Sequence, residues 1–227
     1  MVASYLARHK PKSKVLILDA KDNFSKQGLF TQGWRELYGE RIEWVSLSND
    51  GKVTRVDAAR GEVETEFGTR HKADVLNVIP PQKAGIIAER AGVTNADGWV
   101  PVKPNTFESE QAKDVYVIGD ASIAAPMPKS GFSANAQGKV VAAAIVASRA
   151  GFEPVKPTWA NTCYSLLSPD YGITVADVYR IEDNKLVAAP GGGVSPLDAS
   201  PAFRKAEADY ARGWYEAIAQ DTWGTRY

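Results

Sequence analysis

The chain has 227 residues, of which 44% are apolar and 24% are charged, and 27 lysines and arginines balance 27 aspartates and glutamates. A chain of this length can bury a core in one large or two modest domains. The formal charge of zero, without a basic stripe, argues against a nucleic-acid partner. The longest apolar run, around residues 140–147, is too short to cross a bilayer, so we expect no transmembrane segment.

The first elements of the chain match the second half of a βαβ unit. Residues 2–9 carry apolar side chains at helical spacing, and residues 14–19, Lys-Val-Leu-Ile-Leu-Asp, predict a buried parallel strand. The helix lacks a Ser, Thr or Asp cap, and the strand that would precede it in such a unit is missing from the sequence. We therefore expect the chain to be the C-terminal part of a longer protein.

An acidic residue, Asp19, ends this predicted strand. In dinucleotide-binding units such a residue binds a ribose hydroxyl, and the glycine-rich turn that accompanies it lies about 20 residues upstream. Counting back from Asp19 leads to a position before Met1. Two interpretations stay open: Asp19 is a ribose ligand, or it is a turn residue at a strand end.

The next residues predict a helix and several short strands. A helix over 30–38 gathers its aromatic and leucine side chains on one face. Asn-Asp-Gly and Arg-Gly turn signals then separate short alternating runs, and an apolar run ends at Pro80-Pro81. The predicted elements are a β-meander over 42–47, 52–57 and 62–67, a buried strand over 73–79 and a helix over 82–91.

A strand that ends in Gly-Asp carries the strongest chemical signal. Residues 115–120, Val-Tyr-Val-Ile-Gly-Asp, place Gly119 and Asp120 at the carboxyl end of a predicted strand, where ligands bind in open α/β folds. Gly119 permits close approach of a ligand to the backbone, and Asp120 can accept hydrogen bonds from sugar or ribityl hydroxyls. A small-residue helix over 132–149 then points its positive N-terminal end at the same place, which favours a reduced flavin anion.

The composition changes after Gly151, in the region that contains the only cysteine, Cys163. One cysteine cannot form an internal disulfide, so Cys163 is either an inert buried thiol or the partner of a cysteine outside this sequence. Two strands over 172–181 and 185–189 and a helix that starts near Ser200-Pro201 follow. The helix is expected to bury Phe203, Tyr210, Trp214 and Ile218.

Three segments resemble a known group of flavoproteins. Residues 114–121 resemble the second flavin-binding motif of two-dinucleotide-domain flavoproteins such as glutathione reductase and sulfide:quinone oxidoreductase. Residues 125–138 are similar to the segment of flavocytochrome c sulfide dehydrogenases, and of their quinone-reducing relatives, that passes along the isoalloxazine ring. The stretch from Asn161-Thr-Cys-Tyr-Ser-Leu to residues 221–224 resembles the extra domain of the flavocytochrome c type.

This resemblance implies an α/β fold with partial FAD/NAD(P)-binding Rossmann-like domains, made of a parallel sheet plus a β-meander, and then a small α+β C-terminal domain. The implied domains are a partial NAD-like domain over 1–80 that lacks its first strand, the C-terminal segment of the FAD-binding domain over 81–153, and a flavocytochrome c sulfide dehydrogenase-type domain over 154–227. The residues implied to contact FAD are Gly119, Asp120, Lys129, Ser130, Gly131, Ser133, Ala134, Asn135 and Gln137.

The resemblance also implies an oxidoreductase. Flavoprotein subunits of this family oxidise sulfide with a redox-active cysteine pair beside FAD and pass electrons to a c-type cytochrome subunit, and Cys163 matches the second cysteine of that pair. The first cysteine, the adenosine-binding glycine turn and any covalent flavin attachment belong to the family's N-terminal half, so we expect this chain alone to be inactive. Residues 1–10 do not form a secretory signal, so the expectation of a periplasmic location rests on the family alone. No metal-ligand spacing is present.

Two alternatives stay open. A sulfide:quinone oxidoreductase-like flavoprotein would need an apolar membrane-docking surface near the tail. A non-catalytic module that binds a cytochrome and carries no flavin would not depend on Cys163. The final helix carries charged residues in place of an apolar surface: Arg204, Lys205, Glu207, Asp209 and Arg212.

Overall fold

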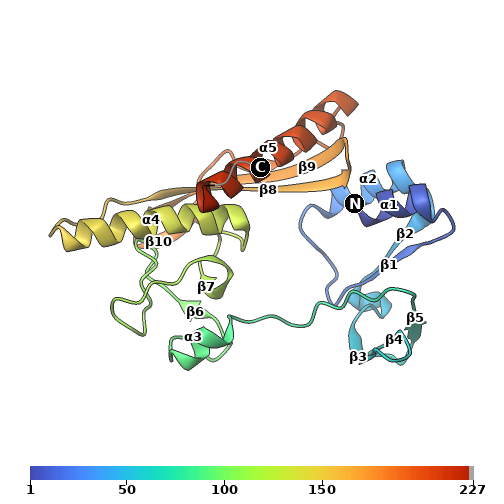
Figure 1. Cartoon of the computed structure of the whole chain (residues 1–227), viewed down its shortest axis with the longest axis horizontal. Coiled ribbons are helices and arrows are strands. Elements are labelled where there is room, and N and C mark those ends of the chain that lie inside the picture. The colour runs from blue at the N-terminus through green and yellow to red at the C-terminus, as the bar shows by residue number, and fades with distance from the viewer. Residues whose placement is uncertain (225–227) are drawn as a thin grey trace. The chain divides into compact units, whose positions relative to one another are not determined.

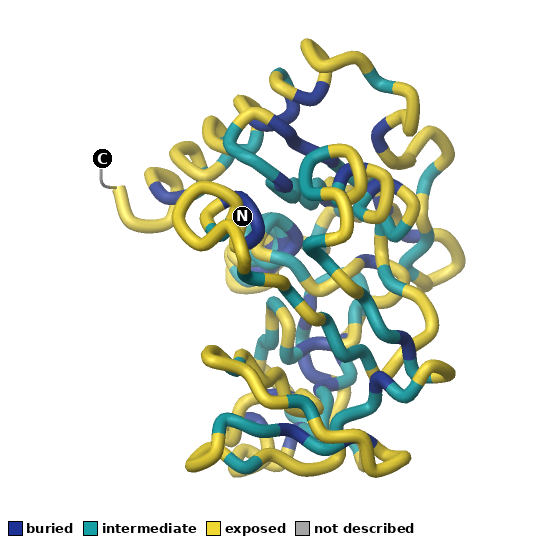
Figure 2. The backbone as a smooth tube through the Cα atoms, turned by 90° about the vertical axis from the view of Figure 1, so that its right-hand side faces the viewer, coloured by how far each residue is buried: buried dark blue, intermediate teal, exposed yellow. Residues whose placement is uncertain are grey.

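The computed structural model describes residues 1–224, which divide into two compact units. One unit holds residues 1–80, 165–173 and 195–209, and the other holds residues 81–164, 174–194 and those from Tyr210 onward. Helices, parallel pairs and antiparallel sheets are mixed along the chain, which confirms the α/β class (Figure 1). Buried stretches are short and are separated by half-buried or exposed ones (Figure 2).

The first unit begins as the helix–strand pattern predicts. Strands β1 and β2 pair in parallel, with Val15 opposite Ile42, and β3, β4 and β5 form an antiparallel sheet. The core of this unit gathers around the buried side chains of Leu29, Leu167 and Ile173. In chain order its elements are α1 (Val2–His9), β1 (Val15–Leu18), α2 (Gln27–Tyr38), the 3-10 helix η1 (Gly39–Arg41), β2 (Ile42–Val45), η2 (Leu47–Asn49), β3 (Val53–Asp57), β4 (Glu62–Thr65) and β5 (Arg70–Lys72).

The predicted β-meander was wrong in its membership. Residues 42–45 do not join it, because β2 pairs with β1 and forms a two-stranded parallel sheet with it. The third strand of the meander is β5, whose sequence Arg-His-Lys has no apolar residue to mark it as a strand. Alternation locates strands that have one buried face, and it does not show which strand is the neighbour.

The strand predicted over 73–79 is not formed. These residues follow an irregular path with no pairing to a described strand, and Val75 is 84% exposed. An apolar run becomes a buried strand only when a neighbour supplies hydrogen-bond partners and a covering layer. The predicted helix over 82–91 is reduced to α3 (Ile86–Arg90), which begins after Gly85.

The second unit places a long helix along a set of antiparallel strands. Strand β9 pairs with β8, β10 and β11, and the short strands β6 and β7 pair in parallel. Residues of β8, β9 and α5 belong in part to each unit, and the three predicted domains stay a prediction. The elements are α3, β6 (Val100–Pro101), η3 (Gly119–Ala121), β7 (Ser122–Ile123), α4 (Gly131–Arg149), β8 (Thr158–Ser168), β9 (Tyr171–Glu182), β10 (Lys185–Ala188), β11 (Gly193–Val194) and α5 (Pro201–Trp223).

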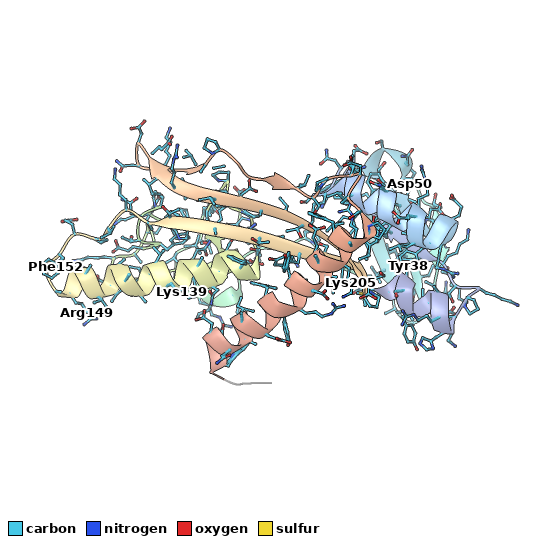
Figure 3. The ribbon with its side chains drawn as sticks, turned by 90° about the horizontal axis from the view of Figure 1, so that it is seen from above. Tyr38, Asp50, Lys139, Arg149, Phe152 and Lys205 are labelled. Atoms are coloured by element: carbon cyan, nitrogen blue, oxygen red, sulfur yellow. The ribbon has the colours of Figure 1, made fainter. Side chains whose placement is uncertain are left out.

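The core of the second unit joins α4 to these strands. Val141 of α4 belongs to one buried cluster with Trp159 of β8 and Tyr179 of β9. Figure 3 shows helix α4, on which Lys139 and Arg149 are labelled, beside the strands β8 and β9. Trp159 and Phe107 are each 1% exposed and meet edge to face, with ring centroids 5.8 Å apart. Burying these large side chains supplies the apolar area that holds this unit together.

The strand predicted over 115–120 is also not formed. The segment makes only an isolated bridge, between Tyr116 and Glu108, although Val117 donates a backbone hydrogen bond to Phe107. Gly119 has a φ of +68°, which ends the extended conformation and starts η3. The Gly-Asp pair therefore lies in a turn that precedes β7.

The face of α5 that is buried differs from the prediction. Phe203 is 44% exposed and Tyr210 is 64% exposed, whereas Arg204 and Glu207 are 2% and 6% exposed. Arg204 and Glu207 form an ion pair at 3.3 Å, which makes their burial tolerable. The pattern of apolar residues missed this face because its polar members are paired.

A close approach of β9 to α5 generates a stability prediction. A Cβ added at Gly172 would lie 2.5 Å from the backbone nitrogen of Ala208, so Gly172→Ala is expected to lower the free energy of unfolding by roughly 1–3 kcal/mol. The control is Gly213→Ala, at a position where a Cβ would meet nothing within 4 Å, and it is expected to be neutral or stabilising by up to about 1 kcal/mol. Urea unfolding followed by tryptophan fluorescence measures both, and equal stability of the two variants would contradict the packing.

Candidate functional site

A pocket of about 350 Å³ opens in the second unit, among residues 95–99, residues 119–130 and the first turns of α4. Its volume lies in the range of small-molecule sites. Five of the residues predicted to contact FAD line it, namely Gly119, Lys129, Ser130, Ser133 and Gln137. The other predicted residues do not line it, namely Asp120, Gly131, Ala134, Asn135 and Cys163.

Gly119 shapes one wall of the pocket. Its positive φ suits glycine, and a Cβ at this position would come within 3.5 Å of the side chain of Ala134. Its backbone nitrogen donates a 2.7 Å hydrogen bond to Oε1 of Gln137, which is 2% exposed. The amide nitrogen of Gln137 lies 3.3 Å from the sulfur of Met127. Gln137 thus ties the Gly-Asp turn to α4 from inside the protein.

Lys129 supplies a positive charge at the pocket. Its ammonium donates hydrogen bonds to the backbone carbonyls of Asp120 and Ser122, the latter at 2.9 Å. The same ammonium lies 3.9 Å from the ring centroid of Trp99, at cation–π distance. Burial lowers the pKa of Lys129, and the Asp120 carboxylate partly opposes this effect. These contacts hold the cation in place.

The first turn of α4 lies beside the same wall, since Ser130 and Ser133 line the pocket. Ser130 caps the helix, because its Oγ accepts a 3.0 Å hydrogen bond from the backbone nitrogen of Ser133. The amides of Gly131 and Phe132 lie in the first turn, where no intrahelical acceptor exists. Together with the helix dipole and Lys129 they favour negative charge near the pocket.

One asparagine joins Cys163 to this wall. Asn161 is 1% exposed, and its Oδ1 accepts hydrogen bonds from the hydroxyls of Ser130 at 2.5 Å and Ser133 at 3.1 Å. Its Nδ2 lies 3.6 Å from the Sγ of Cys163, which is half-buried on β8. The pocket wall and the cysteine are therefore connected through a single side chain.

Asn135 points to a different partner. Its Nδ2 donates a 2.9 Å hydrogen bond to Asp221 of α5, which also pairs with Lys139 at 2.7 Å. The hydrogen bond from Lys139, and then that from Asn135, lower the pKa of Asp221. Asn135 thus fastens α4 to the end of α5.

Sequence reasoning missed Trp99, Asn95 and Asn161. Asn95 shapes the loop before Trp99, since its Oδ1 accepts hydrogen bonds from the backbone nitrogens of Asp97 and Trp99. The Asn-Ala-Asp-Gly turn signal was visible in the sequence, and it places a tryptophan directly after a turn. Asn161 was visible as the residue two before Cys163, on the same face of a strand.

Two classes of site are not found in the part of the chain that the structure describes. Residues 1–224 contain no group of three or more histidine, cysteine, aspartate or glutamate side chains arranged to hold a metal ion. None of the helices within that range is both long and apolar enough to span a membrane.

Comparison with known proteins identifies the family. The family described as the flavocytochrome c sulphide dehydrogenase flavin-binding domain matches residues 155–223, and the central domain of the sulfide dehydrogenase [flavocytochrome c] flavoprotein chain matches residues 1–80. The chain belongs to the flavocytochrome c sulfide dehydrogenase flavoprotein family. Asn161 and Cys163 lie within the first match, and the pocket residues, 95–137, lie between the two matches.

A solved structure shows a similar fold. It is a chain in the cryo-EM structure of the mitochondrial ATP synthase F1Fo composite tetramer of Tetrahymena thermophila, with a TM-score of 0.55 and 20% sequence identity. The match covers 77% of the present chain and 43% of that chain. At this identity the likeness is one of fold.

The family binds a flavin, and the pocket fits one chemically. Flavins present a flat aromatic ring that gains negative charge on reduction. Trp99 and Gly119 line the pocket, and Lys129 with the start of α4 offers positive charge. These residues would hold the flavin that the sequence predicted as FAD.

The loop that leads to Gly119 generates a pH prediction. Hydrogen bonds from Lys103 and then from the backbone of Asp114 lower the pKa of Glu108 from its ordinary value of 4.5. The carboxylate therefore contributes stability above that value, and this contribution is lost as the pH falls below it. Glu108→Gln is expected to be less stable than the wild type at pH 7, with the gap closing below about pH 4.5.

Urea midpoints measured from pH 7 to pH 3 test this expectation. The matched control is Glu110→Gln, which removes an exposed carboxylate from the same loop. A gap between the wild type and Glu108→Gln that stays constant over this pH range would contradict the role of Glu108.

Proposed function

We propose that this chain carries part of the flavin site, and one cysteine of the redox pair, of a sulfide dehydrogenase that passes electrons to a c-type cytochrome in the periplasm. Family membership supports a flavoprotein subunit. The observation that carries the proposal is the connection of Cys163 through Asn161 to Ser130 and Ser133 at the pocket wall. This connection supports the proposal because one side chain links the thiol to the wall at which the flavin would bind.

The proposed chemistry begins with hydrosulfide. Hydrosulfide attacks the disulfide between Cys163 and a cysteine outside this sequence, which breaks that bond, leaves one sulfur as a thiolate and forms a persulfide on the other. Re-formation of the disulfide releases one zero-valent sulfur, one proton and two electrons. FAD accepts the two electrons when it is bound, and a c-type cytochrome receives them next.

The residues of the pocket have separate tasks in this scheme. Lys129 and the first-turn amides of α4 favour the negative charge that a flavin gains on reduction. Trp99 supplies an apolar wall that limits water. Both family matches name the flavocytochrome c type, which favours a cytochrome over a quinone as the acceptor.

The proposal predicts that Cys163→Ser in the full-length subunit retains bound flavin and loses reduction by sulfide. Without the sulfur of Cys163 no disulfide forms, so bleaching of the flavin absorbance after mixing with sulfide is expected to slow by about 100-fold or more. Stopped-flow absorbance measures the rate. Thr162→Ala is the control, since Thr162 precedes Cys163 and points to the opposite face of β8.

Two outcomes separate the alternatives. Bleaching at the wild-type rate in Cys163→Ser would exclude Cys163 from sulfide oxidation. A full-length protein that binds a c-type cytochrome but holds no flavin would support the non-catalytic module, and in that case the same substitution would leave cytochrome binding unchanged.

A further inference from the structure

We propose that Asn161 is a positioning residue that holds the sulfur of Cys163 and donates a hydrogen bond to its thiolate form. The inference rests on the proposed function of Cys163 and extends it, because it assigns the group that keeps the sulfur oriented and stabilises the thiolate when the disulfide opens. It concerns residues of the second unit only.

The orientation of the Asn161 amide is fixed by its surroundings. The side chain is almost fully buried, and Oδ1 accepts from the hydroxyls of Ser130 and Ser133. The Ser130 hydroxyl is itself placed by its role as the cap of α4, where it accepts from the backbone nitrogen of Ser133. The start of α4 thus determines which end of the amide faces Cys163.

The hydrogen bonds already made to Oδ1 of Asn161 favour donation from Nδ2 of Asn161 to the sulfur of Cys163. A side-chain amide oxygen accepts two hydrogen bonds well, and the two serine hydroxyls occupy both positions on Oδ1. A thiol S–H at 3.7 Å would be a third donor to that oxygen. The Nδ2 group, 3.6 Å from Sγ, has protons to donate, and a thiolate is a far better acceptor than a thiol. The geometry therefore offers Nδ2 as the donor to the sulfur of Cys163.

One titratable side chain of the neighbouring strand β9 interacts with Cys163. Tyr179 is 3% exposed and interacts electrostatically with Cys163, and Asp177 accepts a hydrogen bond from Tyr179. Burial, and then Asp177, raise the pKa of Tyr179 to about 12, so this phenol stays neutral at the pH values where thiols react. From α4, the side chains in this network are the uncharged Ser130 and Ser133.

A stabilised thiolate suits the proposed exchange step. When hydrosulfide attacks the partner sulfur of the disulfide, Cys163 is the leaving group, and a better stabilised thiolate leaves faster. A fixed sulfur also keeps its direction relative to the pocket wall during the cycle. Asn161 serves both needs without contacting substrate, which makes it a positioning residue.

The test measures alkylation of Cys163 by iodoacetamide as a function of pH, with the purified chain and mass spectrometry as the readout. Only the thiolate reacts at an appreciable rate. Asn161→Ala is expected to shift the midpoint of the pH–rate profile upward and to slow alkylation at pH 7 by about threefold to tenfold. Thr162→Ala, the control on the opposite face of β8, is expected to keep the wild-type profile.

A second variant keeps the inference testable if Asn161→Ala does not fold. Ser133→Ala leaves Asn161 and the Ser130 cap in place and frees one acceptor position on Oδ1, so the thiol form gains a partner. It is expected to move the midpoint in the same direction by a smaller amount.

An unchanged midpoint in the folded variants would overturn the inference, and so would faster alkylation without a shift, which would show only loosened packing. The assay needs neither flavin nor sulfide. A shifted midpoint without any effect of Cys163→Ser on sulfide oxidation would therefore overturn the proposed function alone, and the reverse result would overturn this inference alone.

Discussion

The hydrogen bonds from two serine hydroxyls of α4 to one buried asparagine of β8 are the contact on which the candidate site depends. Ser130 caps α4 and donates a hydrogen bond to Oδ1 of Asn161. It also follows Lys129 in the sequence, so the start of the helix, the Asn161 amide and the lysine cation are all connected to this one residue. Breaking this contact would release the helix end and the cysteine together. A site assembled in this way is rigid because each group is held by another that is itself packed.

Local sequence signals predicted the elements that make their own contacts. The helix at 131–149 and the hairpin of β9 and β10 follow from spacing, capping and turn residues such as Asp183 and Asn184. Gly119 was predicted because glycine permits close approach of a ligand to the backbone, and its φ of +68° in the structure also suits glycine. The Gly-Asp motif thus located the pocket, although the strand expected before it is an irregular segment.

Features that depend on distant partners were outside the reach of local patterns. Residues 73–79 carry the composition of a buried strand, but a strand forms only against a neighbour. Arg204 and Glu207 are buried because they pair, which no hydropathy pattern reveals. Asn161 and Trp99 acquire their roles from α4 and Lys129, which are far away in sequence. The residues of a site are therefore easier to predict from sequence than the hydrogen bonds and contacts between them.

An experimental structure of the full-length subunit with FAD bound tests the central claim most directly. The account predicts that the isoalloxazine ring occupies the pocket bounded by Trp99, Gly119 and Lys129, with the start of α4 beside the ring and Asn161 between that helix and the sulfur of Cys163. A flavin bound elsewhere, with only solvent in this pocket, would contradict it.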